Sequence, residues 1–249
     1  MFPLGDDNSD RRITPVVNYV LIALNILVFV FLQGLDSTNA FTMAFVTVPE
    51  EILTGRDVVT EATSVRDPVT GEVFSVPGLE PTPISVYITL LTSMFMHAGF
   101  AHIAGNMLYL WIFGDNIENR IGHGRYLVFY LLCGILASLA QIAVTLLGGG
   151  NTQLPSLGAS GAIAGVLGAY LALFPKRRVK VVFMYFLQDM PAVVVIGVWF
   201  VYQVVLGLGM LGGEGGGVAY GAHVGGFVAG FLLIRLFGLG RSASSAAVR

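Results

Sequence analysis

The sequence predicts an all-α polytopic membrane protein, a bundle of six transmembrane helices whose fourth helix is short and starts inside the membrane. Three observations predict this class. Hydrophobic residues make up 55% of the 249 residues and charged residues only 11%, against about 25% charged residues in a soluble domain. The 32 glycines favour helices that pack closely in a membrane. Long stretches also lack Asp, Glu, Lys and Arg, so an ordinary soluble fold and a disordered chain are excluded.

Stretches without charged residues locate the membrane segments. A spanning helix needs about 20 residues. The sequence supports six such helices, at 15–34, 101–118, 124–147, 160–174, 191–211 and 218–237. The apolar run 84–96 is too short for a span and suits an interfacial or partly embedded helix better.

The basic residues orient the bundle. With the N-terminus inside, only Arg56 and Arg66 of the 13 basic residues fall outside, in a long loop where the positive-inside rule is weak. A seventh span at 84–96 would move the basic cluster 176–180 outside, so we reject it. We predict a cytoplasmic segment at 1–14, a membrane domain at 15–238 with an outer loop at 35–83, and a disordered cytoplasmic tail at 239–249.

The fourth helix places a serine at membrane depth. It must end near Pro175, and the 15 residues from Ser160 onward span about 22 Å, less than the ~30 Å of the hydrocarbon core. Ser160 therefore begins a helix below the outer boundary, where free N–H groups and the helix dipole suit an oxyanion. Alternatively, Ser160 is only an N-cap above a small-residue packing face, because Gly161 and Gly165 form a GxxxG pair.

A histidine on the sixth helix falls at a similar depth. His223 lies 12 residues above Arg235, or about 18 Å, and Gly226 and Gly230 repeat the GxxxG spacing below it. Two glycine faces let these helices approach closely, which would bring the imidazole to Ser160 as the base that a serine nucleophile needs. For His223 alone, a buried histidine bonded to a backbone carbonyl is the simpler interpretation. The shared depth and the glycine faces favour the pair.

Two further polar residues share one face of the second helix. His102 and Asn106 are four residues apart, so they lie on the same side. They can donate to an oxyanion, or they can serve as interhelical hydrogen-bonding groups. Zinc binding by His97, His102 and His223 is disfavoured because no HExxH motif is present. We expect no metal and no cofactor.

Three short motifs, in order on the second, fourth and sixth helices, carry a family resemblance. They are His97-Ala-Gly-Phe-Ala-His102-Ile-Ala-Gly-Asn106, Gly158-Ala-Ser160-Gly161-Ala and Ala222-His223-Val-Gly-Gly-Phe-Val-Ala-Gly230. With them the chain resembles the rhomboid intramembrane serine proteases of the bacterial six-helix type, over about 14–238. The expected fold is therefore a rhomboid-like bundle.

The resemblance implies a Ser–His dyad without an acidic member. Ser160 would be the nucleophile and His223 the general base and then acid. His102, Asn106 and the Ser160 backbone N–H would form the oxyanion hole. Gly158 would shape the neighbouring loop, and Gly161 would support the site. Helix five with the linker 212–217 is either a mobile gate or a slack connection.

The resemblance also implies partners and a location. Substrates would be transmembrane segments of membrane-anchored proteins, cleaved in the lipid bilayer of the cell (inner) membrane, with both termini cytoplasmic. The net charge of −2 gives no reason to expect a nucleic-acid partner. The competing hypothesis is a non-catalytic rhomboid-like protein that binds membrane helices. Two departures from the family pattern are a loop 35–83 without a Trp-Arg pair and Ala164 in place of an aromatic residue.

Overall fold

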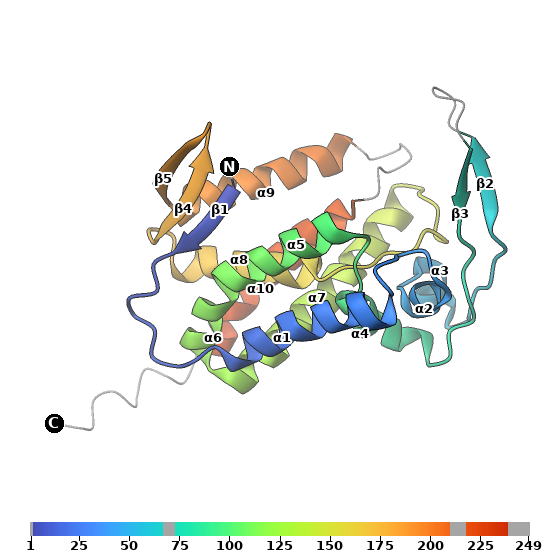
Figure 1. Ribbon diagram of the computed structural model, residues 1–249, viewed down its shortest axis with the longest axis horizontal. Coiled ribbons are helices and arrows are strands. Elements are labelled where there is room, and N and C mark those ends of the chain that lie inside the picture. Colours follow the sequence, from blue (N-terminus) through green and yellow to red (C-terminus); the bar gives the residue numbers. More distant parts are fainter. Residues whose placement is uncertain (1, 67–72, 210–217, 239–249) are drawn as a thin grey trace.

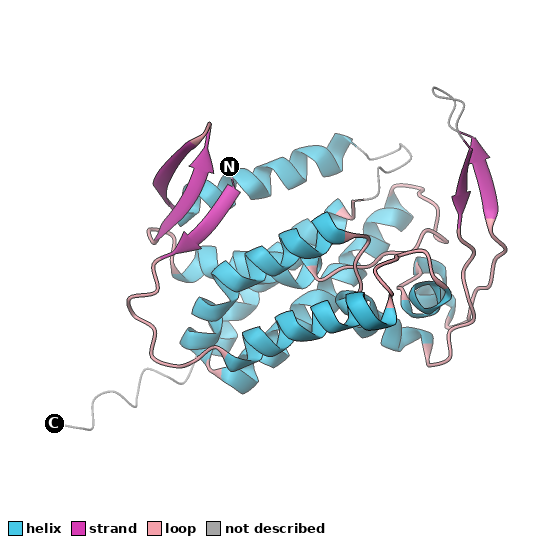
Figure 2. Ribbon diagram, viewed as in Figure 1, coloured by secondary structure: helices cyan, strands magenta, loops and turns pink. Residues whose placement is uncertain are grey.

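Helices make up most of the protein; the long ones lie roughly along one axis, with a small sheet at each end (Figures 1 and 2). The computed structural model describes residues 2–66, 73–209 and 218–238. The predicted tail 239–249 and the glycine linker 212–217 lie outside the described residues. A predominantly helical fold is confirmed.

Each predicted span has a helix at its place. The helices are α1 (Val16–Leu27), extended by a π-helical turn (Val28–Leu32); α5 (Phe100–Tyr109), a second π-helical turn (Leu110–Gly114) and α6 (Asp115–Ile121), which follow one another directly; α7 (His123–Leu147); α8 (Ser160–Leu173); α9 (Ala192–Gly209); and α10 (Tyr220–Gly238). The run 84–96 is divided into short helical turns, namely a 3₁₀ turn (Val86–Ile88), α4 (Thr89–Thr92) and a further 3₁₀ turn (Ser93–Phe95). A non-spanning segment is expected to break up in this way.

Length and composition allow α7, α9 and α10 to cross a membrane. The segments Val86–Phe95 and Phe100–Ile121 are together long and apolar enough for one more span, but they are bent by 83° at the break between them. Val16–Leu32 and α8 are apolar but shorter. The described residues thus support three or four spans, and the count of six remains a prediction.

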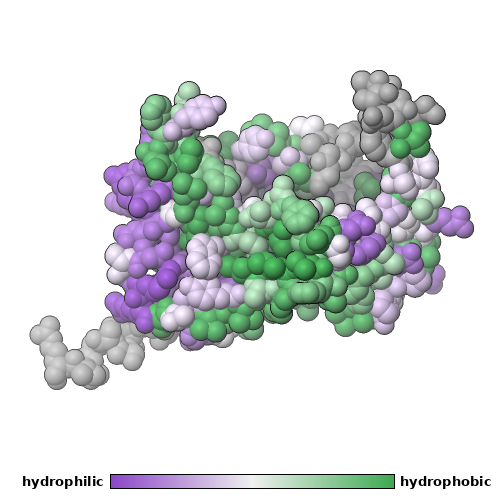
Figure 3. Space-filling view, viewed as in Figure 1, coloured by the Kyte–Doolittle hydropathy of each residue, from purple (hydrophilic) through white to green (hydrophobic). Residues whose placement is uncertain are grey.

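The surface fits a bilayer. Figure 3 shows apolar side chains across the middle of the visible face and hydrophilic ones gathered at the end that carries the N-terminal strand. Large aliphatic residues on the helices, including Val20, Leu24, Val198 and Leu232, are more than 40% exposed. Such exposure is costly in water but favourable against lipid.

Two small sheets correct the prediction of an all-α fold. Strand β1 (Phe2–Asp6) pairs antiparallel with β4 (Arg178–Phe183), which pairs antiparallel with β5 (Phe186–Pro191), in the order β1-β4-β5. The loop 35–83 contains α2 (Ala40–Phe45), α3 (Pro49–Thr54) and the hairpin of β2 (Thr63–Arg66) and β3 (Val73–Val76). These strands have four to six residues, too short to stand out beside apolar runs of 20.

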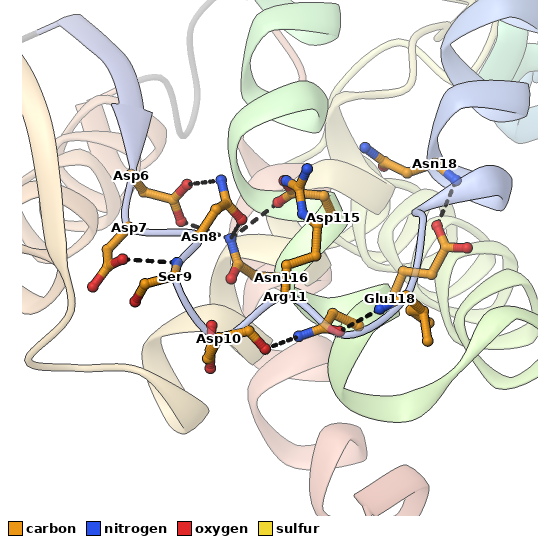
Figure 4. Close-up of polar contacts among 12 residues, drawn as sticks. Asp6, Asp7, Asn8, Ser9, Asp10, Arg11, Asn18, Asp115, Asn116 and Glu118 are labelled. Atoms are coloured by element: carbon orange, nitrogen blue, oxygen red, sulfur yellow. Dashed lines mark hydrogen bonds and ion pairs between the residues drawn. The ribbon is translucent and has the colours of Figure 1, made fainter.

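A polar cluster ties the N-terminal segment to the helix ends beside it (Figure 4). The amide nitrogen of Asn116, on α6, donates to Asp6 at 2.7 Å and to Asn8 at 3.2 Å. Arg177, just before β4, forms an ion pair of 2.6 Å with Asp10. Arg11 forms a second ion pair, with Asp115 of α6, and Tyr170 of α8 donates to Asp6. Strand pairing and these polar contacts therefore attach residues 2–11 to the helix ends.

The carboxyl group of Asp6 makes this cluster sensitive to pH. Burial raises its pKa to about 7, and its charged or titratable neighbours are Tyr170, Asp115, Arg177 and Arg11. Because the folded pKa exceeds the unfolded value of about 4, the protonated group stabilises the fold fully below about pH 4, and this contribution is lost as the pH rises through 7. When the pH is raised from 5 to 8, we expect the thermal unfolding midpoint of the wild type to decrease more than that of Asp6→Asn. Parallel midpoint curves for the two proteins would contradict this.

A buried carboxylate joins the first helix to the second. Glu118, on α6, accepts the backbone N–H groups of Val17 at 2.9 Å and Asn18 at 2.7 Å. These N–H groups lie in the first turn of α1 and have no partner within the helix. A negative charge there is also attracted by the positive end of the helix dipole. Pro15 holds the N-cap position and supplies no side-chain acceptor. Glu118 therefore replaces the missing cap and fixes α1 against the segment that carries His102 and Asn106.

Helices α8 and α10 meet through glycines. A Cβ on Gly226 would lie 2.1 Å from the carbonyl oxygen of Gly161, and one on Gly230 would lie 1.9 Å from that of Gly165. A Cβ on Gly168 would lie 2.1 Å from the carbonyl oxygen of Phe227. No side chain larger than hydrogen fits at these positions, so the backbones are in direct contact. The close approach predicted from the two GxxxG pairs is confirmed.

Candidate active site

Ser160 is the first residue of α8, and its hydroxyl oxygen lies 2.8 Å from Nε2 of His223. Ala159 holds the N-cap position, and the helix end has no side-chain cap bond. The interpretation of Ser160 as only an N-cap is therefore wrong. The glycine contact between α8 and α10 is what brings these two side chains, 63 residues apart in the sequence, to hydrogen-bonding distance.

His223 lies in the first turn of α10 and has a second side-chain partner. Its Nδ1 is 2.7 Å from Oε1 of Gln203 on α9. The ring also lies beside Trp199, at 6.0 Å between ring centroids, and Tyr220, at 6.3 Å. Both ring nitrogens thus face side chains, which contradicts the alternative of a histidine bonded to a backbone carbonyl.

The partners define where the proton of the imidazole sits. An amide oxygen can only accept a hydrogen bond, so Nδ1 of His223 must carry the hydrogen that it donates to Gln203. In the neutral ring, Nε2 then has a free lone pair. That lone pair faces the Ser160 hydroxyl, the geometry required for removing its proton.

Gly158 allows His102 to lie against the loop before Ser160. Gly158 has φ of +127°, and a Cβ there would lie 2.9 Å from Cε1 and 3.1 Å from Nε2 of His102. Nδ1 of His102 accepts the N–H of Ala98 at 3.1 Å, so in the neutral ring Nε2 carries the hydrogen. An N–H donor therefore points toward the loop that leads into Ser160. The loop is fixed by the N–H of Gly158, which donates to Ser93 at 2.9 Å.

Asn106 lies one turn beyond His102 on α5 and is 8% exposed. Its amide nitrogen has no hydrogen-bond partner among the residues that the structure describes. No hydrogen bond joins it to Ser160, His223 or another helix within this part of the chain, so the interpretation as an interhelical hydrogen-bonding group finds no support. A buried amide without a partner is costly, and a ligand oxygen would satisfy it.

A narrow cavity of about 20 Å³ borders Ser160. That volume is enough for one water molecule, which needs roughly 10–15 Å³ by this measure. The cavity is lined by serines and small residues, among them Ser93, Ser138, Ser156, Gly158 and Gly161. Gly161 is also closely packed against α7, because a Cβ there would lie 2.6 Å from Cβ of Ala137.

Substitution of Gly158 by alanine is expected to slow the reaction of Ser160 with an acylating or phosphonylating probe by about tenfold, or roughly 1.4 kcal/mol in the barrier. The added Cβ would displace His102, and the positive φ disfavours any residue other than glycine. The measurement is the rate of covalent labelling. Gly149→Ala is the matched control, because Gly149 has φ of +67° but an added methyl group there meets no atom within 4 Å in the part of the chain that the structure describes. Equal slowing in both variants would show that backbone strain alone is responsible.

The sequence interpretation missed Gln203. It is the only amide or charged side chain in α9 and is 6% exposed. An amide in an otherwise apolar helix was the available signal, because such a group needs a partner. The departure at Ala164 is also explained. Ala164 is fully buried, and the aromatic rings beside His223 come from Trp199 and Tyr220 instead.

Comparison with known proteins identifies the family. The Rhomboid domain family model matches residues 85–239, more than half of the chain. The chain belongs to the rhomboid family. The region matched includes the rhomboid motifs around His102, Ser160 and His223. With its apolar helices, this rhomboid is a multi-pass membrane protein.

Curated relatives agree with this assignment. The rhomboid is 30% identical over 233 residues to Rhomboid protease GluP of Bacillus subtilis, covering 92% of this chain and 36% of the relative. It is 31% identical to mitochondrial Rhomboid protein 1 of Saccharomyces cerevisiae, over 62% of this chain and 43% of the relative. It is 31% identical to the human mitochondrial presenilin-associated rhomboid-like protein, over 45% of this chain and 32% of the relative. The chain thus spans less than half the length of these relatives.

Proposed function

We propose that this rhomboid is an intramembrane serine endopeptidase that cleaves transmembrane segments of membrane-anchored proteins with Ser160 and His223. The observation that carries the proposal is the 2.8 Å contact between the Ser160 hydroxyl and Nε2 of His223. Family membership and the similarity to Rhomboid protease GluP support the same class of reaction. No cofactor and no metal is part of the proposed chemistry.

The proposed reaction proceeds through an acyl-enzyme. Oγ of Ser160 attacks the scissile carbonyl carbon while Nε2 of His223 takes the hydroxyl proton. The carbonyl oxygen becomes an oxyanion that accepts hydrogen bonds from the Ser160 backbone N–H, the His102 ring and the Asn106 amide. The C–N bond then breaks as His223 gives its proton to the leaving amine. A water molecule, activated by the same ring, hydrolyses the ester and regenerates Ser160.

The substrate is proposed to reach this site from the bilayer. Ser160 begins a helix of 14 residues, about 21 Å long and shorter than the ~30 Å hydrocarbon core. A helix that short, ending at the basic cluster, starts below the outer boundary. The scissile bond of a transmembrane segment would meet the serine there.

The proposed topology has six spans in the cell (inner) membrane. The segment 1–14 and the tail 239–249 face the cytoplasm, the domain 15–238 is embedded, and the loop 35–83 lies on the outer side. A reporter fused after Lys180 is expected to map to the cytoplasm. Activity of a periplasm-specific reporter at that position would overturn the six-span arrangement.

Covalent labelling tests the proposed nucleophile directly. A fluorophosphonate is expected to label the wild type in detergent, and peptide mapping is expected to place the adduct on Ser160. Ser160→Ala should take no label, and His223→Ala should label far more slowly because the hydroxyl keeps its proton. Labelling that persists in Ser160→Ala would assign the nucleophile elsewhere. A wild type that neither labels nor cleaves would favour the non-catalytic, helix-binding alternative.

A further inference from the structure

We infer that Gln203 is a third member of this site, a positioning residue on α9 that fixes the orientation and the tautomer of His223. The inference rests on the proposed function of Ser160 and His223. It replaces a dyad by a Ser–His–Gln arrangement in which the third group is neutral. In this arrangement, the orientation of His223 depends on α9 as well as on α8 and α10, the helices that carry Ser160 and His223.

The contact is short and enclosed. Oε1 of Gln203 lies 2.7 Å from Nδ1 of His223, across 20 residues of sequence. Gln203 is 6% exposed, whereas its neighbours Tyr202 and Val201 are 58% and 60% exposed. The amide therefore points into the bundle while the adjoining side chains face outward. An amide at that depth is costly unless it is bonded, and the imidazole is its bonded partner.

The chemistry of the amide oxygen assigns the role. Because this oxygen only accepts, it holds the hydrogen on Nδ1 and leaves the lone pair of Nε2 directed at Ser160. After Nε2 takes the serine proton, Nδ1 still donates to the same oxygen, so the charged ring keeps its partner. An amide performs this task beside the histidine in Cys–His–Asn proteases. Without Gln203, Nδ1 of His223 has no other hydrogen-bond partner in the described part of the chain.

The position of Gln203 on α9 adds a regulatory consequence. The buried residues of α9 are Ala192, Val195, Ile196 and Gln203, so Gln203 is the buried residue furthest along the helix. Phe200 stacks on Phe227 of α10 at 4.2 Å between ring centroids, which is an apolar contact. Among the described residues, the hydrogen bond between Gln203 and His223 is the polar contact that links α9 to the site. The base is therefore oriented only while α9 lies against α10.

Three variants separate orientation from packing. Gln203→Met keeps the length of the side chain and removes the acceptor, Gln203→Glu keeps an acceptor, and Phe200→Leu alters the contact between α9 and α10 without touching the imidazole. The measurements are kcat and KM for a transmembrane reporter in liposomes, the pH–rate profile, the fluorophosphonate labelling rate and the thermal unfolding midpoint.

We expect Gln203→Met to lower kcat and the labelling rate about tenfold, with KM changed less than about twofold and an unfolding midpoint like that of Phe200→Leu. Gln203→Glu should recover most of kcat and move the acidic limb of the pH–rate profile to higher pH, because a carboxylate favours the charged ring. Phe200→Leu should retain kcat and the wild-type pH profile.

Two results would overturn the role of Gln203. One is wild-type kcat and labelling in Gln203→Met. The other is an unchanged kcat in Gln203→Met, with only KM or the unfolding midpoint altered, and altered as much as in Phe200→Leu. That result would indicate a role in packing alone. Failure of the proposed function has a different signature, because the wild type would then neither be labelled nor cleave the reporter, or Ser160→Ala would still do so.

Discussion

Alanine in place of Ser160 or His223 is expected to lower cleavage of a transmembrane reporter by at least about a thousandfold. Removing Ser160 deletes the atom that attacks the carbonyl carbon. Removing His223 deletes the acceptor 2.8 Å from that atom and leaves a hydroxyl that is a weak nucleophile at neutral pH. Because the two side chains act as a unit, the double variant should lose little more than either single variant. The measurement is the initial rate of product formation in liposomes.

Matched controls come from the same residue types elsewhere in the chain. Ser85→Ala removes an exposed serine that precedes the 3₁₀ turn Val86–Ile88. His123→Ala removes a histidine at the start of α7 that contacts Glu118. Both variants should retain cleavage within a few-fold of the wild type. Cleavage by Ser160→Ala or His223→Ala at the rate of these controls would refute the proposed pair.

Gly230→Ala is expected to reduce cleavage about a hundredfold, although Gly230 lies seven residues beyond His223. The added Cβ would lie 1.9 Å from the carbonyl oxygen of Gly165, so α8 and α10 must move apart. A displacement of about 1 Å between reacting groups costs roughly a hundredfold in rate, and overpacking of this kind costs about 1–3 kcal/mol of stability. The measurements are reporter cleavage, the labelling rate of Ser160 and the thermal unfolding midpoint.

Gly197→Ala and Gly238→Ala are the controls for this effect. Gly238 is on the same helix as Gly230, and Gly197 is on α9. A methyl group at either position meets no atom of the described residues within 4 Å. Both variants should be as active and as stable as the wild type, or slightly more stable, because alanine favours a helix. If Gly230→Ala behaved like them, the direct contact of the two backbones would not be needed to assemble the site.

The helices and the Ser160–His223 pair could be predicted because the residues that indicate them lie within single segments of the sequence. Apolar runs without charge mark each helix, and the distance along a helix from a basic anchor gives the depth of a residue. Depth alone does not place a side chain, because the direction in which it points around the helix is also needed. The rotation of α9 about its own axis decides whether Gln203 faces His223, and no count of residues gives that angle. The GxxxG pairs supplied the missing rotation for α8 and α10, whereas α9 has no comparable glycine face.

The sheet β1-β4-β5 and the polar cluster were not predicted for another reason. Each strand is short, and although β4 and β5 form a hairpin across only two residues, β1 pairs with a strand far along the chain. Phe2 is opposite Val182 in the β1–β4 ladder, and local periodicity does not reveal a pairing over such a distance. The same limit applies to Asp6 and Asn116, whose contact joins residues 110 positions apart. For the segment 1–14, the sequence therefore predicts a cytoplasmic location but not the strand that it contains.

The pairing of β1 with β4 also sets an order of assembly during synthesis. A ribosome that adds about 5–20 residues per second makes Val182 roughly 10–40 s after Phe2. Strand β1 must wait through the synthesis of α1, α5, α7 and α8 before its partner exists. Asp6 and Asp10 are likewise held without Asn116 and Arg177 until those residues emerge. Strand β1 is thus synthesised long before it can be placed, and its docking marks a chain that has been translated past α8.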